Sequence, residues 1–127
     1  MSSIIKGSFL AIFMLFSLSV SASDAKNIFD RYCTVCHTAS MAPMFGAPAA
    51  HDLDAWNARK DDAFLRAVEN DASLESLVGT AKDEAAMKSL VLSAINGTDK
   101  GMPPMGTCMD CDENDLRAAI EFMSGAE

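Results

Sequence analysis

Apolar residues recur at the spacing of one helix face in three stretches of the chain, residues 24–37, 83–96 and 112–123. An amphipathic helix shows this period because residues three and four positions apart lie on the same side. Residues that suit helix ends mark all three stretches: Ser23 or Asp24 can cap the first, Gly97 follows the second, and Asp112 opens the last. The pattern therefore predicts helices over all three.

The segment between the first two predicted helices is harder to assign. Residues 54–59 and 63–68 each suit a short helix, whereas residues 70–73 have the composition of a turn. The Gly and Pro residues between positions 43 and 48 are expected to end regular structure after the first helix. We find no candidate chemistry between residues 62 and 81.

The start of the chain has the pattern of a secretory signal peptide. Only Lys6 is charged before Asp24, and a largely apolar run at residues 9–20 is followed by a small-residue cleavage site. The run is too short for a stable membrane span. We therefore expect a signal peptide at residues 1–22 and one domain at residues 23–127. An uncleaved N-terminal segment, which would tie the chain to a membrane, is the alternative.

The charge of the chain restricts its partners. There are 10 Lys and Arg against 18 Asp and Glu, and loss of the single lysine in the signal peptide leaves a net charge of about −9. An acidic surface argues against nucleic-acid binding, which favours basic patches. It suits brief docking on a protein with a basic surface, and it equally serves solubility.

Cys33-Thr34-Val35-Cys36-His37 has the Cys-x-x-Cys-His pattern of covalent haem attachment. The two thiols lie about one helical turn apart, so both can form thioethers with the vinyl groups on one edge of a porphyrin. His37 is then held beneath the iron as its proximal ligand. We predict one haem c per chain, bound through Cys33 and Cys36.

Zinc binding and thiol chemistry are the alternatives, because a second pair, Cys108 and Cys111, follows later in the chain. The 71 residues between Cys36 and Cys108 exceed the roughly 15–20 that a zinc ribbon places between its pairs. In an exported protein the second pair is expected to form a disulfide that holds the preceding loop against the last helix. A redox relay is the alternative role for this pair.

A proximal histidine needs an acceptor that orients its other ring nitrogen. We assign this role to the carbonyl of Pro43, in the loop after His37, although an ordinary loop proline is the alternative. Trp56 and Arg59 are candidates for binding a haem propionate, through the indole N–H and the guanidinium, with Lys60 as the alternative to Arg59. A plain packing role for Trp56 also stays open.

The stretch Gly101-Met102-Pro103-Pro104-Met105 supplies the candidate sixth ligand. A thioether sulfur is a soft donor that suits haem iron opposite a histidine. Two prolines stiffen the loop that would present it. We predict Met102 as the second axial ligand, with Met105, His51 and an open coordination position as the alternatives.

Together these features resemble the class I c-type cytochromes, and more closely the cytochrome c5 branch, which has a second Cys-x-x-Cys just after its axial methionine. The resemblance implies an all-α domain of about four to five helices around one covalently bound haem. It also implies Met102 as an axial ligand and a Cys108–Cys111 disulfide. The matching stretches are residues 33–37, 42–46, 55–56, 93–97, 102–104 and 106–111.

Two features depart from the family pattern. Residues 62–81 look like an insertion of about a dozen residues or more. Met105 stands where the family usually has a basic residue. The second departure removes a positive charge that is often found near the exposed haem edge, and this would alter docking on partners.

The resemblance implies a periplasmic electron carrier that is not an enzyme and has no small-molecule substrate. Its expected partners are transient redox proteins, such as a membrane respiratory complex or a terminal reductase. One alternative is a sensor of small ligands such as CO or NO, or a weak peroxidase, and either requires a displaceable Met102. Another is a haem subunit held permanently in a larger complex.

Overall fold

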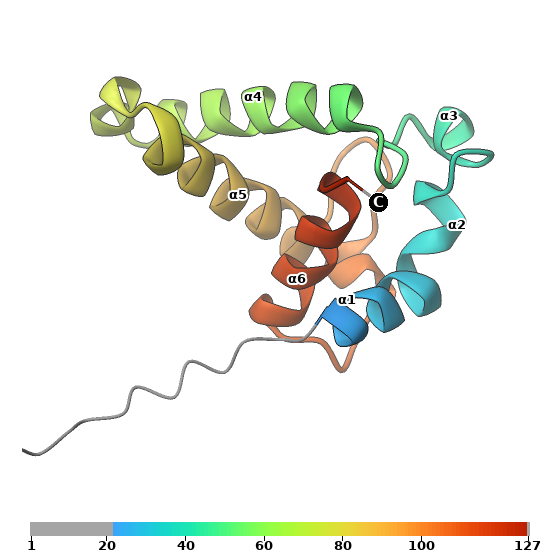
Figure 1. Cartoon of the computed structure of the whole chain (residues 1–127). Helices are drawn as coiled ribbons and strands as arrows, with labels where there is room; N and C mark the ends of the chain where they lie inside the picture. The colour runs from blue at the N-terminus through green and yellow to red at the C-terminus, as the bar shows by residue number, and fades with distance from the viewer. Residues whose placement is uncertain (1–21, 127) are drawn as a thin grey trace, which may run out of the picture.

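Helices account for most of residues 22–126, which are the residues that the computed structural model describes, and this part of the chain contains no strand (Figure 1). The predicted all-α class is therefore confirmed. Nearly all of the expected signal peptide lies outside the described residues, and the first helix begins at Ala22. In order, the elements are α1 (Ala22–Ile28), the π-helical turn η1 (Phe29–Cys33), α2 (Thr34–His37), α3 (Ala42–Phe45), α4 (Leu53–Asn70), η2 (Ala72–Ser76), α5 (Gly79–Asn96), η3 (Pro104–Thr107) and α6 (Glu113–Ser124).

The helices predicted at the two ends of the domain are present. α1, η1 and α2 follow one another without a break as far as His37. α6 begins after Asp112, whose carboxylate accepts a hydrogen bond from the backbone N–H of Asp115, while the Asp115 carboxylate accepts one from the N–H of Asp112. This capping box satisfies two N–H groups at the helix start and fixes where α6 begins.

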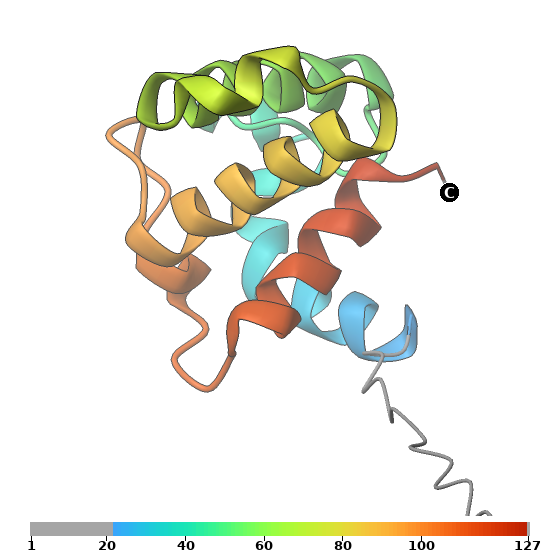
Figure 2. The same cartoon turned by 90° about the vertical axis from the view of Figure 1, so that its left-hand side faces the viewer.

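The middle of the chain forms a hairpin of two long helices, where the sequence predicted short helices and a turn. α4 is continuous because no Gly or Pro interrupts it, and Asp61 and Asp62 lie on its exposed side. α5 begins at Gly79, four residues earlier than predicted. α4 and α5 pack along each other and are joined through η2 (Figures 1 and 2). The predicted break within residues 53–70 is therefore wrong.

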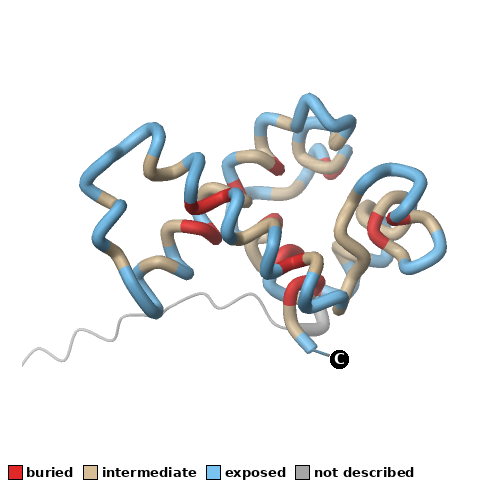
Figure 3. The backbone as a smooth tube through the Cα atoms, turned by 90° about the horizontal axis from the view of Figure 1, so that it is seen from above, coloured by how far each residue is buried: buried red, intermediate tan, exposed pale blue. Residues whose placement is uncertain are grey.

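The core lies where α4, α5 and α6 converge, and α1 packs on α6. Buried segments gather between the helices, whereas the outer turns are exposed (Figure 3). The apparent insertion at residues 62–81 forms the outer end of the hairpin. Within residues 22–126, none of the helices has the length and apolar character that crossing a bilayer requires. The buried cluster consists of Trp56, Met87, Val91, Ala94, Leu116, Ile120 and Met123.

Candidate functional site

A cavity of about 510 Å³ opens between the cysteine-bearing helix, α4, α5 and the loop that follows α5. Cys33, Cys36, His37 and Met102 all line it. The Cys-x-x-Cys-His motif and the methionine loop lie far apart in the sequence, so the packing of the helices brings them together. A cavity of this volume falls in the range of small-molecule and cofactor sites.

His37 is buried, and the loop that follows it orients its ring. The Nδ1–H of His37 donates to the carbonyl oxygen of Pro48 over 2.8 Å. Burial is the main cause that lowers the pKa of His37; the bond to Pro48 opposes it, and the positive charge of Arg59 adds to it. The ring is therefore neutral near pH 7, and Nε2 is the nitrogen that the Pro48 bond leaves for a metal.

The acceptor is Pro48 and not Pro43, so the prediction of Pro43 is wrong. Pro43 lies within α3, where helical geometry directs its carbonyl along the helix axis. Gly46 ends α3 in the left-handed conformation, with φ +60°, and turns the chain so that Pro48 reaches His37. A proline carbonyl does orient the His37 ring, but which proline reaches the ring depends on α3, a short helix that was not predicted from the sequence.

Trp56 and Arg59 line the cavity, and both donate to the loop after His37. The indole N–H of Trp56 donates to the carbonyl of Ala49 over 2.9 Å, and its ring stacks on that of His37 with centroids 5.8 Å apart. The guanidinium of Arg59 donates to the carbonyl of Gly46. The single N–H of Trp56 is directed to Ala49, and the predicted bond from Trp56 to a propionate remains a prediction. Arg59 has further N–H groups, so its predicted role remains a prediction.

Cys33 and Cys36 are free thiols at the wall of the cavity. Burial, together with the neighbouring Cys36, raises the pKa of Cys33 to about 11. A reactive thiol needs a lowered pKa, so this environment disfavours thiol chemistry. Among the described residues no group of three or more His, Cys, Asp or Glu side chains is placed to hold a metal ion.

Thr98 holds Met102 through two hydrogen bonds. The backbone N–H of Thr98 donates to the carbonyl of Met102 over 2.9 Å, and the N–H of Met102 donates to the Thr98 hydroxyl over 3.2 Å. Gly97 permits this close approach, because a Cβ there would lie 2.9 Å from both the Met102 carbonyl oxygen and the Pro104 nitrogen. The loop therefore presents Met102 at a fixed place on the cavity wall.

The alternative ligands lie elsewhere. The Nδ1–H of His51 donates to the carbonyl of Gly125 over 2.9 Å, and its ring meets that of Phe122 at a centroid distance of 4.9 Å. Met105 packs against the core with a left-handed backbone, at φ +59°. Of the three candidates for the sixth ligand, only Met102 lines the cavity.

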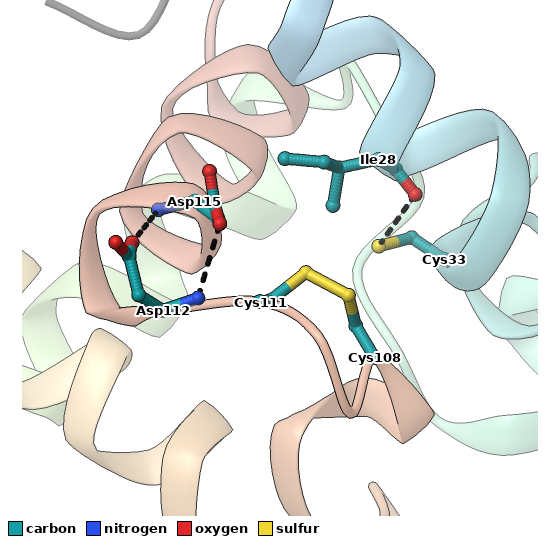
Figure 4. The surroundings of a disulfide bond; sticks show 6 residues. All are labelled: Ile28, Cys33, Cys108, Cys111, Asp112 and Asp115. Carbon is teal, nitrogen blue, oxygen red and sulfur yellow. Dashed lines mark hydrogen bonds between the residues drawn. A yellow bond between two sulfur atoms is a disulfide. The ribbon is translucent and has the colours of Figure 1, made fainter.

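A disulfide joins Cys108 and Cys111, whose Cα atoms are 5.4 Å apart (Figure 4). Cys108 is buried, and Asp112, which caps α6, follows the pair directly. The sulfur of Cys33 lies on the neighbouring helix, 4.0 Å from the carbonyl oxygen of Ile28. In this arrangement the disulfide closes the short segment that leads from η3 into α6.

Three residues at the site were missed by the sequence analysis. Pro48 and Thr98 act through loop geometry, for which the sequence carries no clear signal. Arg66 lines the cavity from α4, seven residues after Arg59. That spacing indicates a shared helix face, but only once residues 53–70 are recognised as one helix.

The donor set of the cavity fits the haem that the sequence motif predicts. Two free thiols, a neutral imidazole and a thioether line one space, and these are the groups that form thioethers and ligate haem iron. Leu90, Ala94 and Ile120 add apolar wall. The residues present therefore match the chemical needs of a covalently bound porphyrin.

Comparisons with known proteins match most of the chain, including the residues that line the cavity. Residues 20–123 match the family model described as cytochrome C oxidase, cbb3-type, subunit III. The chain is 32% identical over 104 residues to cytochrome c5 of Ectopseudomonas mendocina, covering 82% of this chain and 91% of that protein. It is 28% identical over 104 residues to cytochrome c5 of Azotobacter vinelandii, covering 82% and 95%. No solved structure gives a significant match.

Proposed function

Because the chain belongs to the class I c-type cytochromes and is similar to cytochrome c5, we propose that it carries single electrons between periplasmic redox proteins through an iron ligated by His37 and Met102. Membership of the family implies one covalently bound haem c per chain and a role in electron transfer. The proposed ligation rests on one observation: Cys33, Cys36, His37 and Met102 all line the same cavity.

The haem supplies a one-electron couple, and the residues of the chain bind and hold it. We assign the two thioethers to Cys33 and Cys36. Pro48 holds the imidazole of His37 in one orientation, and Thr98 holds the backbone of Met102. His37 and Met102 would together supply two ligands to the iron, which would leave no coordination position for a substrate, and this supports a carrier and not an enzyme.

The proposed location follows from the N-terminal sequence. Residues 1–22 are assigned as a signal peptide and residues 23–127 as the exported domain. A disulfide between Cys108 and Cys111 suits an oxidising compartment. N-terminal sequencing of the protein from its own cells tests this assignment, and a first residue of Ser23 is the expected result.

The surface charge supports a basic docking partner. Residues 61–84, which form much of the α4–α5 hairpin, contain seven acidic and two basic side chains, and all seven acidic residues are exposed. Opposite charges speed the encounter of two proteins, and salt weakens this effect. We therefore propose transient partners with a basic surface, such as a membrane respiratory complex or a terminal reductase.

Spectroscopy of the exported protein tests the proposed function. Acid–organic extraction should leave the haem on the polypeptide, because thioethers resist it. The ferrous spectrum should be low-spin and should stay the same when carbon monoxide is added, since His37 and Met102 occupy the iron. Extraction of the haem from the protein contradicts the attachment at Cys33 and Cys36. Rapid carbon monoxide binding would instead favour the sensor or peroxidase alternative.

A subunit held permanently in a larger complex is the other alternative. The family model that residues 20–123 match is described as an oxidase subunit, and this description applies to the family and not to this chain in particular. Size-exclusion chromatography of a native extract separates the two cases. A free carrier elutes at the size of a single small domain, whereas a docked subunit elutes with a much larger complex.

A further inference from the structure

α4 presents two guanidinium groups to the cavity, from Arg59 and Arg66. They are seven residues apart on one face of the helix, which separates their Cα atoms by about 10 Å along its axis. Arg59 is engaged by the carbonyl of Gly46. Within residues 22–126 the Arg66 side chain makes no hydrogen bond and no ion pair. Arg66 is therefore a cation at the cavity whose charge is not yet matched.

The charges around Arg66 make its lack of a partner unusual. The hairpin segment at residues 61–84 is strongly acidic, and its other basic residue, Lys82, pairs with Asp61 at 3.3 Å. Arg66 instead lines the cavity. A guanidinium binds carboxylates in a planar, two-point geometry, so the side chain is suited to an anionic group that enters the cavity.

A haem brings two such groups, because the edge opposite its vinyl groups carries two propionates. The vinyl edge is fixed by Cys33 and Cys36, and the C-terminal half of α4 lies well apart from α2 (Figure 1). Among the described residues, Lys100 also lines the cavity, and so does its neighbour Asp99, which carries the opposite charge. Arg66 is thus a second cation, beside Arg59, that can meet a carboxylate, and its side chain has no partner within the described residues.

We propose that Arg66 binds a carboxylate of the haem and thereby raises the reduction potential of the iron. The inference rests on the proposed haem site. Arg66 acts through the carboxylate, as a positioning residue, and its positive charge favours the ferrous over the ferric state. The proposed role of Arg66 also gives the apparent insertion at residues 62–81 a function. Arg66 belongs to this segment, and it lines the cavity because α4 continues to Asn70.

Voltammetry of the intact holoprotein across a range of pH tests the inference. Arg66→Gln should lower the reduction potential. It should also move the pH at which a propionate ionises upward by about one pH unit or more, since an opposite charge depresses a carboxyl pKa by that amount. Arg66→Lys should restore most of the potential. The control is Lys88→Gln, which removes the same charge from an exposed site on α5 and should change neither quantity appreciably.

Asp99 is the competing partner, since it lines the same cavity. If the effect of Arg66→Gln disappears in the Asp99→Asn background, Arg66 pairs with Asp99 and the inference is wrong. It is also wrong if Arg66→Gln behaves like Lys88→Gln. Should Arg66→Gln fold poorly, Arg66→Met decides, because it removes the charge and keeps an unbranched apolar stem: an upward shift of the propionate ionisation supports the inference, and an unchanged value contradicts it. A wild-type protein without attached haem refutes the proposed function itself.

Discussion

The two loops that carry the proposed axial ligands are held in different ways. The loop after His37 is fixed by hydrogen bonds from buried side chains, which run from His37 to Pro48 and from Trp56 to Ala49. The N–H of Ala50 also donates to the carbonyl of His37, over 2.7 Å. This side of the cavity is therefore tied to the core at several points.

The loop around Met102 depends on the backbone instead. It needs a glycine at position 97 for close approach, and three successive residues, Met105 to Thr107, adopt left-handed conformations. A left-handed backbone costs roughly 1–2 kcal/mol at a residue other than glycine. The Cys108–Cys111 disulfide then closes the segment after the loop.

The difference indicates which ligand is lost first. Side-chain hydrogen bonds to buried residues resist local opening, whereas strained and exposed loops open more easily. We therefore expect Met102 to detach before His37 under heat, denaturant or reduction of the disulfide. Each of the following changes weakens one of the two loops and so tests this ranking.

Replacing the ligand itself should have the largest effect. Met102→Ala should open one axial position, so that the ferrous protein binds carbon monoxide, and it should lower the reduction potential because Met ligation raises it. The measurement is a carbon monoxide titration followed in the visible spectrum. Met105→Ala is the matched control, since Met105 is the neighbouring methionine but does not line the cavity. Equal carbon monoxide binding by both variants would argue against Met102 as the ligand.

A glycine in each loop provides the next comparison. Gly97→Ala should cost about 3 kcal/mol of unfolding free energy, because it combines a left-handed φ of +76° with a backbone clash at 2.9 Å. Gly46→Ala in the other loop should cost only about 1 kcal/mol, since its added Cβ meets no atom within 4 Å. Urea unfolding measures both. Equal costs would remove the argument that Gly97 sets the position of Met102.

Removing the disulfide should have a moderate effect on the Met102 side. The double substitution Cys108→Ala and Cys111→Ala should lower the free energy of unfolding by about 2 kcal/mol, as the loop that the bond closes is short. It should also speed carbon monoxide binding to the ferrous form, because the methionine loop is released. Thiol labelling of the unfolded wild type checks the premise: no label is expected before reduction and two labels after it. Two labels before reduction would show that the disulfide is absent.

The smallest effect is expected at Trp56. Trp56→Phe keeps most of the packing and removes the hydrogen bond to Ala49, which should cost about 1 kcal/mol in urea unfolding. Carbon monoxide binding should stay as in the wild type, because this change acts on the His37 side. Easier binding of carbon monoxide in this variant would mean that the two loops are coupled and not independent.

The helices at the two ends of the domain could be predicted from the sequence, because local signals define them. The Asp112–Asp115 capping box and the apolar stripe of the last helix act over a few residues. The long helices of the hairpin could not be predicted in the same way. Asp61 and Asp62 interrupt the apolar pattern of α4, and only the packing of α5 shows that these residues form the exposed side of a continuous helix.

The residues of the site show the same contrast between local sequence signals and long-range packing. Cys33, Cys36, His37 and Met102 were proposed from their chemistry, and the structure brings them to one cavity. The residues that orient them were predicted less well. Which proline carbonyl reaches His37 depends on the path of a whole loop, and a left-handed Gly46 decides it in favour of Pro48. Long-range geometry of this kind has no counterpart in residue spacing.

The most direct test of the central claim is the proton NMR spectrum of the ferrous holoprotein with 13C-labelled methionine methyl groups. A methyl group held over the face of a porphyrin is strongly shielded by the ring current. If Met102 ligates the iron, one methyl resonance should be shifted far upfield, and it should be absent in Met102→Leu and retained in Met105→Leu. A spectrum with no shifted methyl, or one in which the Met105 substitution removes it, would contradict ligation by Met102.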